Sequence, residues 1–96
     1  MNVGTKQVKV ALLGVGHMGQ HHLRILSILK DVEVVNIYDV DEVVLRQFSE
    51  KYNVPYTLDL NEALDGVDAA IIATPTSTHS EYFNVVVEKV KYIFVE

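Results

Sequence analysis

Three glycines in the spacing G-x-G-x-x-G stand near the start of the chain, at Gly14, Gly16 and Gly19. They follow the apolar run Val8–Leu13 without a spacer and precede a pattern of helical period. An acid, Asp39, comes about twenty residues after the last glycine. A strand that ends in such a loop, opens a helix and is followed by an acid at this distance is typical of dinucleotide-binding units. The sequence therefore predicts a dinucleotide site.

Each glycine has a separate physical task in this prediction. Gly14 lets the chain turn sharply out of the strand, and Gly16 lets the backbone approach a pyrophosphate that a Cβ atom would hold away. Gly19 allows the helix to pack closely on the strand. The pyrophosphate is expected on the free N–H groups of the helix that begins near His17 and Met18. The alternative is a plain strand-turn-helix in which the glycines only make the turn.

Asp39 closes the second expected strand, where a carboxylate can bond the adenosine ribose hydroxyls and repel a 2′-phosphate. No arginine stands beside it in the sequence to pair with such a phosphate. We therefore expect NAD to bind in preference to NADP. The alternative for Asp39 is an ordinary turn or helix-capping aspartate.

A second unusual stretch begins at Thr74, directly after the apolar run Ala69–Ala73. Thr74, Pro75 and Thr76 are expected to form a wall beside the cofactor, because the proline fixes the loop and removes a donor. His79 is expected in the first turn of the next helix, facing the same point, where it can touch cofactor or substrate. The alternatives are a simple strand stop for Thr74 and Pro75, and a capping or solvent-exposed histidine at 79.

His17 and His21 lie four residues apart on the first expected helix, a spacing at which two imidazoles can share a metal ion, and His22 adjoins them. Against a metal site, His17 belongs to the glycine loop and no carboxylate lies nearby to complete the ligand set. We expect no metal. The absence of cysteine excludes disulfides and thiolate metal ligands.

The composition bounds the class of protein. With 96 residues, of which 49% are hydrophobic, the chain is expected to form a single globular domain. Its net charge is −5 and its eight lysines and arginines are spread singly, so nucleic acid is not an expected partner. No apolar run approaches the ~20 residues of a membrane span, and the first residues are too polar for a signal peptide. We expect a cytoplasmic protein without a membrane partner.

Apolar runs and turn signals divide the chain into alternating strands and helices. The expected strands are Val8–Leu13, Glu33–Tyr38, Pro55–Thr57, Ala69–Ala73 and Tyr92–Val95. The expected helices are His17–Lys30, one capped by Asp41 that stops by Asn53, a brief one from Asp59 through Leu64 that Gly66 closes, and one opened by a capping box of Thr78 and Glu81. Helical spacing assigns their buried sides to Met18, His22, Ile25, Leu26 and Leu29, then to Leu45, Phe48 and Tyr52, and finally to Phe83, Val86, Val87 and Val90.

Strands that alternate with helices in this way predict an α/β fold, a doubly wound parallel sheet of the Rossmann type with the strand order 3-2-1-4-5. In that order the chain reverses direction between strands one and four. Ligands bind at such a switch point, outside the carboxyl ends of the strands. The loops Gly14–Gly19 and Thr74–His79 meet there, which is the main argument for a real site.

These pieces together resemble the Gfo/Idh/MocA oxidoreductases over Val8–Glu96. The shared motifs are Gly14-x-Gly16-x-x-Gly19-x-x-His22, Asp39 at the end of strand two, Ala73-Thr74-Pro75-x-x-x-His79 after strand four, and Phe94-Val95-Glu96, which is similar to the front of the family's Glu-Lys-Pro motif. The resemblance implies a Rossmann domain over residues 1–96 that binds NAD or NADP, with Glu96 at the cofactor. It also implies a following, larger sheet domain for a sugar, cyclitol or related hydroxy compound, and a homo-oligomer.

In that family the lysine of Glu-Lys-Pro and a histidine of the second domain serve the proton and hydride chemistry. The sequence stops at Glu96, one position before that lysine, so we expect a truncated domain that holds the cofactor, has no catalytic residue of its own and is inactive alone. The alternative for Glu96 is a mere strand end. The family's usual glycine at the end of the preceding helix is replaced at Val90-Lys91, where a left-handed valine would cost about 1–2 kcal/mol. That helix is therefore expected to end differently.

Two other functions compete with a nicotinamide-dependent oxidoreductase. A regulatory dinucleotide-sensing module without catalysis shares the glycine loop and the acid, although Thr74-Pro75-x-x-x-His79 argues for the enzyme. A methyltransferase generally lacks the third glycine.

Tyr92–Val95 is expected to be an exposed edge strand through which the 96-residue chain self-associates. Ile93→Lys is a control for this expectation if that side chain faces outward.

Overall fold

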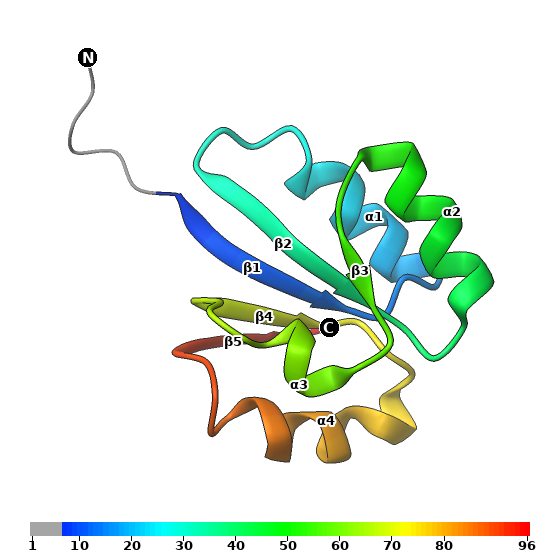
Figure 1. Cartoon of the computed structure of the whole chain (residues 1–96). Helices are drawn as coiled ribbons and strands as arrows, with labels where there is room; N and C mark the ends of the chain where they lie inside the picture. Colours follow the sequence, from blue (N-terminus) through cyan, green and yellow to red (C-terminus); the bar gives the residue numbers. More distant parts are fainter. Residues whose placement is uncertain (1–6) are drawn as a thin grey trace.

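A computed structural model describes residues 7–96 and contains one five-stranded parallel sheet in the order β3-β2-β1-β4-β5. The predicted strand order is confirmed (Figure 1). The strands are β1 (Val8–Leu13), β2 (Val32–Tyr38), β3 (Tyr56–Thr57), β4 (Ala69–Ile72) and β5 (Tyr92–Val95). The helices are α1 (His17–Leu26), α2 (Glu42–Tyr52), α3 (Leu60–Ala63) and α4 (His79–Val86), with a 3₁₀ turn, η1 (Thr76–Thr78), directly before α4.

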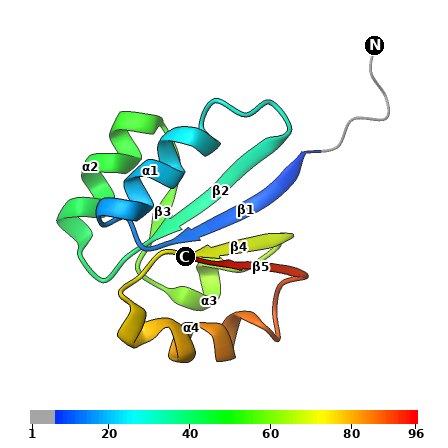
Figure 2. The same ribbon diagram turned by 180° about the vertical axis from the view of Figure 1, so that it is seen from behind.

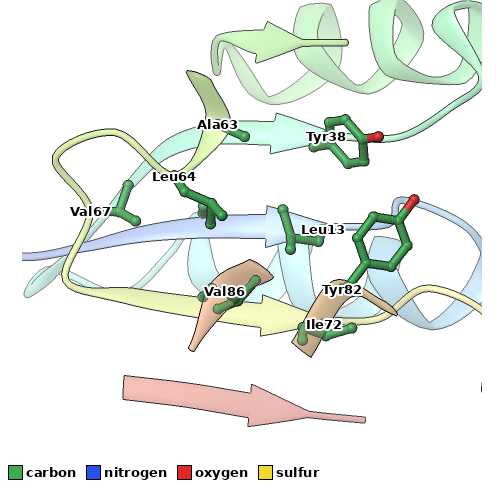
Figure 3. Packing of buried hydrophobic residues seen from close by; sticks show 10 residues of the cluster. Leu13, Tyr38, Ala63, Leu64, Val67, Ile72, Tyr82 and Val86 are labelled. Carbon is green, nitrogen blue, oxygen red and sulfur yellow. The ribbon is translucent and has the colours of Figure 1, made fainter. Parts of the chain in front are cut away.

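The helices cover the sheet from both sides, α1 and α2 on one face and α3 and α4 on the other (Figures 1 and 2). The core is accordingly divided in two. On the α1 side the buried side chains are Leu12, Val15, Leu23, Val34, Ile37 and Leu45. On the α4 side they are Ala11, Leu13, Tyr38, Ala63, Leu64, Val67, Ala70, Ile72, Tyr82 and Val86, several of which are labelled in Figure 3.

The register brings three strand ends to one edge of the sheet. Leu13 lies opposite Tyr38 of β2 and Ile72 of β4. The backbone pairing continues one step into the loops, because the N–H of Gly14 donates to the carbonyl of Tyr38 (2.7 Å) and the N–H of Ala73 donates to that of Leu13 (2.8 Å). The loops after β1, β2 and β4 therefore begin side by side, as the switch-point argument requires.

The first helix differs from the prediction in length and in its buried side. It ends at Leu26 rather than Lys30, where Ser27 Oγ donates to the carbonyl of Arg24 (2.7 Å) and the next N–H groups bond three residues back in a tight turn. Strand β2 then begins at Val32 rather than Glu33. Leu23, which is absent from the predicted apolar side, is fully buried.

The predicted apolar side of α1 is thus wrong for most of its members. Met18, Ile25 and Leu29 are each nearly half exposed, whereas Leu26 packs against the core. Apolar residues occur on two sides of this helix, and the sheet can bury only one of them. Leu23 lies on the side that faces the sheet, and its burial contributes roughly 1.5–3 kcal/mol.

The predicted capping box of α4 is also wrong. The Thr78 side chain does not cap the helix, since its Oγ1 donates to the carbonyl of Pro75 (2.6 Å) and closes η1 instead. Val86 is buried as predicted, but Phe83 and Val87 are more than 40% exposed and Tyr82 takes the inner position. Because the 3₁₀ turn precedes α4, the helix begins in a different orientation. The buried positions counted from a cap at Thr78 are therefore not the ones that face the sheet.

The end of α4 confirms the expectation drawn from the missing glycine. The helix stops at Val86 with a right-handed residue, Val87, and the N–H groups of Lys89 and Val90 both bond the carbonyl of Val86. Within residues 7–96, Asn53 is the sole non-glycine residue with a positive φ, at 54°. No strained valine is therefore needed to leave this helix.

The other local signals hold. Asp41 and Asp59 each accept two backbone N–H bonds and cap α2 and α3. Helix α2 stops at Asn53 as predicted, β3 is a short edge strand after Pro55, and Gly66 (φ 73°) follows α3. In the part of the chain from 7 to 96, no helix combines the length and the apolar character of a membrane span.

Candidate functional site

A cavity of about 570 Å³ opens at the carboxyl edge of the sheet, between the loops that follow β1, β2 and β4. It collects every predicted site residue except Gly19 and His79. The predicted residues in its wall are Gly14, Gly16, His17, Met18, Asp39, Thr74, Pro75, Thr76 and Glu96. Four further residues line the cavity and were not predicted as site residues, namely Val40, Asp41, Val44 and Ala73. The only signal for them is their position, since the first three follow the strand that Asp39 closes and Ala73 directly precedes Thr74.

Gly14 and Gly19 are glycines because the protein leaves no room for a side chain. Gly14 has φ +100°, and a Cβ atom there would lie 2.8 Å from the backbone of Ala73 and Thr74. A Cβ on Gly19 would collide with the carbonyl of Gly14. The predicted sharp turn at Gly14 and the predicted close packing of α1 at Gly19 are both present. The backbone that Gly19 approaches is that of Gly14, the first residue after β1.

Gly16 is different, because a Cβ atom there would meet no atom of residues 7–96 within 4 Å. Its φ of −70° is one that any residue can adopt. The protein's own packing therefore does not require glycine at this position. What glycine provides is open space on the cavity wall, where backbone can approach a ligand closely.

No side chain of α1 or its cap offsets the positive end of the helix dipole at the α1 N-terminus. Gly16 is its N-cap and offers no side-chain bond, and the first turn carries no acidic residue. His17 and Met18, the first two residues of α1, line the cavity, and the N–H groups of a helix's first turn carry the positive end of its dipole. This is the arrangement that binds phosphate groups at helix N-termini.

Asp39 serves the loop and the cavity at once. Its Oδ2 accepts the N–H of Val15 (2.9 Å) and its Oδ1 accepts the N–H of Asp41 (3.0 Å). The carboxylate thus connects the glycine loop to the end of β2. Asp39 therefore both holds a turn and lines the cavity, two functions that the sequence presented as alternatives. Each oxygen keeps a free lone pair for a further donor. Within residues 7–96, the cavity wall carries carboxylates and no lysine or arginine.

Thr74 bears on whether the cavity suits a polar ligand. Its Oγ1 is buried and has no hydrogen-bond partner among residues 7–96. A buried hydroxyl without a partner costs free energy, so native proteins almost always satisfy it. Since Thr74 lies in the wall of the cavity, a polar ligand group there would complete the hydrogen bonding, and the residues present fit a dinucleotide.

His79 lies behind the loop rather than in the cavity wall. Its Nε2 is 2.7 Å from the carbonyl of Thr74, and the ring is partly buried. It therefore braces the loop through its main chain. The predicted direct contact with cofactor or substrate has no counterpart in the cavity wall as the structure has it.

Glu96 lines the cavity and pairs with His22 of α1, with Oε1 and Nε2 2.5 Å apart. The His22 ring also stands edge-on to Phe94, at 6.1 Å between centroids. His22, assigned to helix packing by the sequence, thus connects α1 to the end of β5. His17 and His21 pack edge to face at 5.2 Å, and residues 7–96 hold no group of three side chains suited to a metal ion.

The family model for oxidoreductases with an NAD-binding Rossmann fold, Gfo/Idh/MocA, matches residues 8–96. The 4-carboxy-2-hydroxymuconate-6-semialdehyde dehydrogenase of Sphingobium sp. is 35% identical over 93% of this chain and 29% of its own length. The scyllo-inositol 2-dehydrogenase (NAD(+)) of Bacillus subtilis is 33% identical over 94% of this chain and 28% of its own. The chain therefore spans little more than a quarter of these relatives.

Solved structures agree. GenD2 from gentamicin A biosynthesis, in complex with NAD, superimposes with a TM-score of 0.88 and 29% identity, covering 94% of this chain and 26% of GenD2. The myo-inositol dehydrogenase of Lactobacillus casei, in complex with NAD(H) and myo-inositol, gives a TM-score of 0.84 and 26% identity over 93% of this chain and 28% of its own. With its glycine loop, sheet order and matched residues in agreement, the chain belongs to the Gfo/Idh/MocA oxidoreductase family and forms an NAD-binding Rossmann unit.

Proposed function

We propose that the chain is the cofactor-binding part of a dehydrogenase that acts on a cyclitol, a sugar or a related hydroxy compound. The observation that carries this is the single cavity in which the open side of Gly16, the Asp39 carboxylate and the unpartnered Thr74 hydroxyl converge. The relatives are named as dehydrogenases, several of them of inositols, which supports catalysis over a purely sensing module.

The residues of the cavity divide the work of holding NAD, which when bound supplies the hydride-accepting ring. The N–H groups of His17 and Met18, beside the open Gly16, hold the pyrophosphate. Asp39 accepts the adenosine ribose hydroxyls on its free lone pairs. Thr74, Pro75 and Thr76 form the opposite wall, and His79 fixes that wall through the Thr74 carbonyl.

Glu96 lines the same cavity and is paired with His22 of α1. We infer that the groups that move the substrate proton lie outside residues 1–96 and that a following domain binds the substrate. The full protein is proposed to be a homo-oligomer, as the resemblance implies. In this arrangement the present residues bind and orient the cofactor, and none of them acts as acid or base.

The test is calorimetric titration of the chain with NADH. Gly16→Val is expected to abolish measurable binding and leave the circular dichroism spectrum unchanged, because Gly16 lines the cavity and a Cβ atom there meets no atom of residues 7–96 within 4 Å. Asn84→Val, an exposed position on α4, is the matched control and should bind as the parent does. Normal binding by folded Gly16→Val would show that the loop is only a turn.

A further inference from the structure

A second hollow, of about 250 Å³, lies between α1 and α2, the helices that cover one face of the sheet (Figure 2). Its wall comes from both helices and includes His17, His21, Arg24, Phe48, Lys51 and Tyr52. No aspartate or glutamate of residues 7–96 lines it. His17 lines the cavity as well, so the two spaces share a residue at the N-terminus of α1. The hollow is therefore a cationic surface beside the cavity.

The two cationic side chains of the hollow, Arg24 and Lys51, are exposed and form no ion pair with a carboxylate of residues 7–96. Neither has an acid three or four positions away on its own helix, the spacing at which helical ion pairs form. Arg46 shows the contrast, because Glu42 lies four positions before it and their charged atoms are 3.4 Å apart. Lys51 instead lies over two aromatic rings, at 6.0 and 5.5 Å from their centroids. The positive charge of the hollow is therefore not compensated within the described part of the chain.

The cavity itself has the opposite charge. Its carboxylates belong to Asp39, Asp41 and Glu96, and the chain as a whole carries a net charge of −5. A dinucleotide is anionic at its pyrophosphate, so the field of these groups opposes its approach from solution. The dipole of α1 acts only near the helix terminus, because its effect falls off within the first turn. A positive charge that acts over a longer distance is what offsets the opposing field.

Arg24 is close enough to the cavity to supply such a charge. It follows His17 by seven residues on the same helix, which corresponds to about 10 Å along the helix axis. The Debye length is ~30 Å at 0.01 M ionic strength and only ~3 Å at 1 M. The charges of the hollow therefore act at the shared His17 when the salt concentration is low, and they are screened when it is high.

We propose that the hollow between α1 and α2 is an encounter surface for the dinucleotide, on which Arg24 and Lys51 attract the phosphates toward the cavity. This inference rests on the proposed function. Because neither residue lines the cavity, neither contacts the cofactor once it is bound. The two charges therefore raise the rate constant of association and leave the rate constant of dissociation unchanged.

The experiment is a stopped-flow measurement of NADH binding to the chain, with NADH fluorescence as the signal. At ~0.01 M ionic strength, the double variant Arg24→Gln, Lys51→Gln is expected to associate about three- to tenfold more slowly than the unmodified chain. Its dissociation rate constant should be the same. At ~1 M salt, the two proteins should associate at the same rate, because the charges are screened. Arg24→Lys keeps the charge and should behave as the unmodified chain does.

The double variant Lys89→Gln, Lys91→Gln is the matched control. It removes the same charge from the loop before β5, at the opposite edge of the sheet, where neither lysine lines the cavity or the hollow. Its association should be that of the unmodified chain. Equal slowing in both double variants would assign the effect to net charge and overturn the proposal.

An unchanged association rate in Arg24→Gln, Lys51→Gln would also overturn it, as would faster dissociation, which would make these residues contacts of the bound cofactor. Circular dichroism establishes that each variant is folded. Failure of the unmodified chain to bind NADH at all would instead refute the proposed function itself.

Discussion

At the scale of single residues, several side chains hold the loops and line the cavity at the same time. Asp39 accepts two backbone N–H groups and still faces the cavity. The Thr74 hydroxyl has no hydrogen-bond partner in the part of the chain that the structure describes, while the Thr74 carbonyl lies 2.7 Å from His79 Nε2. The residues that shape the site are thus also the ones that can contact the ligand. A substitution there can disturb the loops as well as a ligand contact, so the ratio of a variant's affinities for two ligands is more informative than either affinity alone.

The cofactor preference is a prediction at this scale. Because Asp39 and Asp41 line the cavity without a lysine or arginine, NADH should bind at least about tenfold more tightly than NADPH, or ~1.4 kcal/mol. Asp39→Asn removes the charge but keeps an oxygen for the Val15 N–H, so the ratio should shrink. Parallel calorimetric titrations measure both. Equal affinities in the unmodified chain would contradict the role given to Asp39.

At the scale of elements, helix termini decide how the loops enter the site. The α1 N-terminus is left without a side-chain cap, whereas Asp41 accepts the N–H groups of Val43 and Val44 at 3.0 and 3.3 Å and closes that of α2. An uncapped terminus can bind an anion, and a capped one is already satisfied. The difference between the two helices directs the pyrophosphate to α1.

The cap of α2 gives the prediction at this scale. Asp41→Ala should lower the free energy of unfolding by about 1 kcal/mol, because two N–H groups lose their acceptor. Asp41→Asn retains an oxygen in place and should lose much less. Urea denaturation of the chain measures both. A loss as large in the asparagine variant as in the alanine variant would assign the effect to charge rather than to capping.

At the scale of the whole molecule, β5 is the longer of the two edge strands of the sheet, the other being the two-residue β3. Tyr92 and Phe94 are each more than half exposed on the α1 side. Ile93 faces the other way and packs against the α4 side of the core, so the condition under which Ile93→Lys could serve as a control, an outward-facing side chain, is not met. The exposed aromatic side chains and the unpaired backbone groups of β5 together favour association of this edge with a second copy of the chain.

The chain of 96 residues is therefore expected to self-associate at about 100 μM, as measured by sedimentation velocity. Phe94→Lys should shift the distribution toward monomer, since a charged side chain on an edge strand opposes further pairing. Val43→Lys, at an apolar position on the outer surface of α2 that is 76% exposed, is the control and should not shift it. If the unmodified chain sediments as a monomer, this edge does not drive self-association.

The sequence by itself determined the strand order, the places of the glycines, the caps at Asp41 and Asp59 and the meeting of two loops at one edge. The caps and turns depend on local chemistry, namely a left-handed residue in a turn or a short oxygen-bearing side chain before a helix, which acts within a few residues. The strand order and the meeting of the loops follow from the alternation of strands and helices and from the fixed handedness of their connections.

Only the tertiary structure decided which side of a helix is buried and where polar side chains point. Leu23 replaces Met18 and Ile25 in the core because the sheet accepts one of two apolar sides of α1. Thr78 turns back to Pro75, and His79 to Thr74, because η1 starts the last helix differently. Tyr82 reaches Tyr38 across 44 positions of sequence only because β2 and α4 pack together. Such choices depend on distances between elements, which no periodicity within a single element contains.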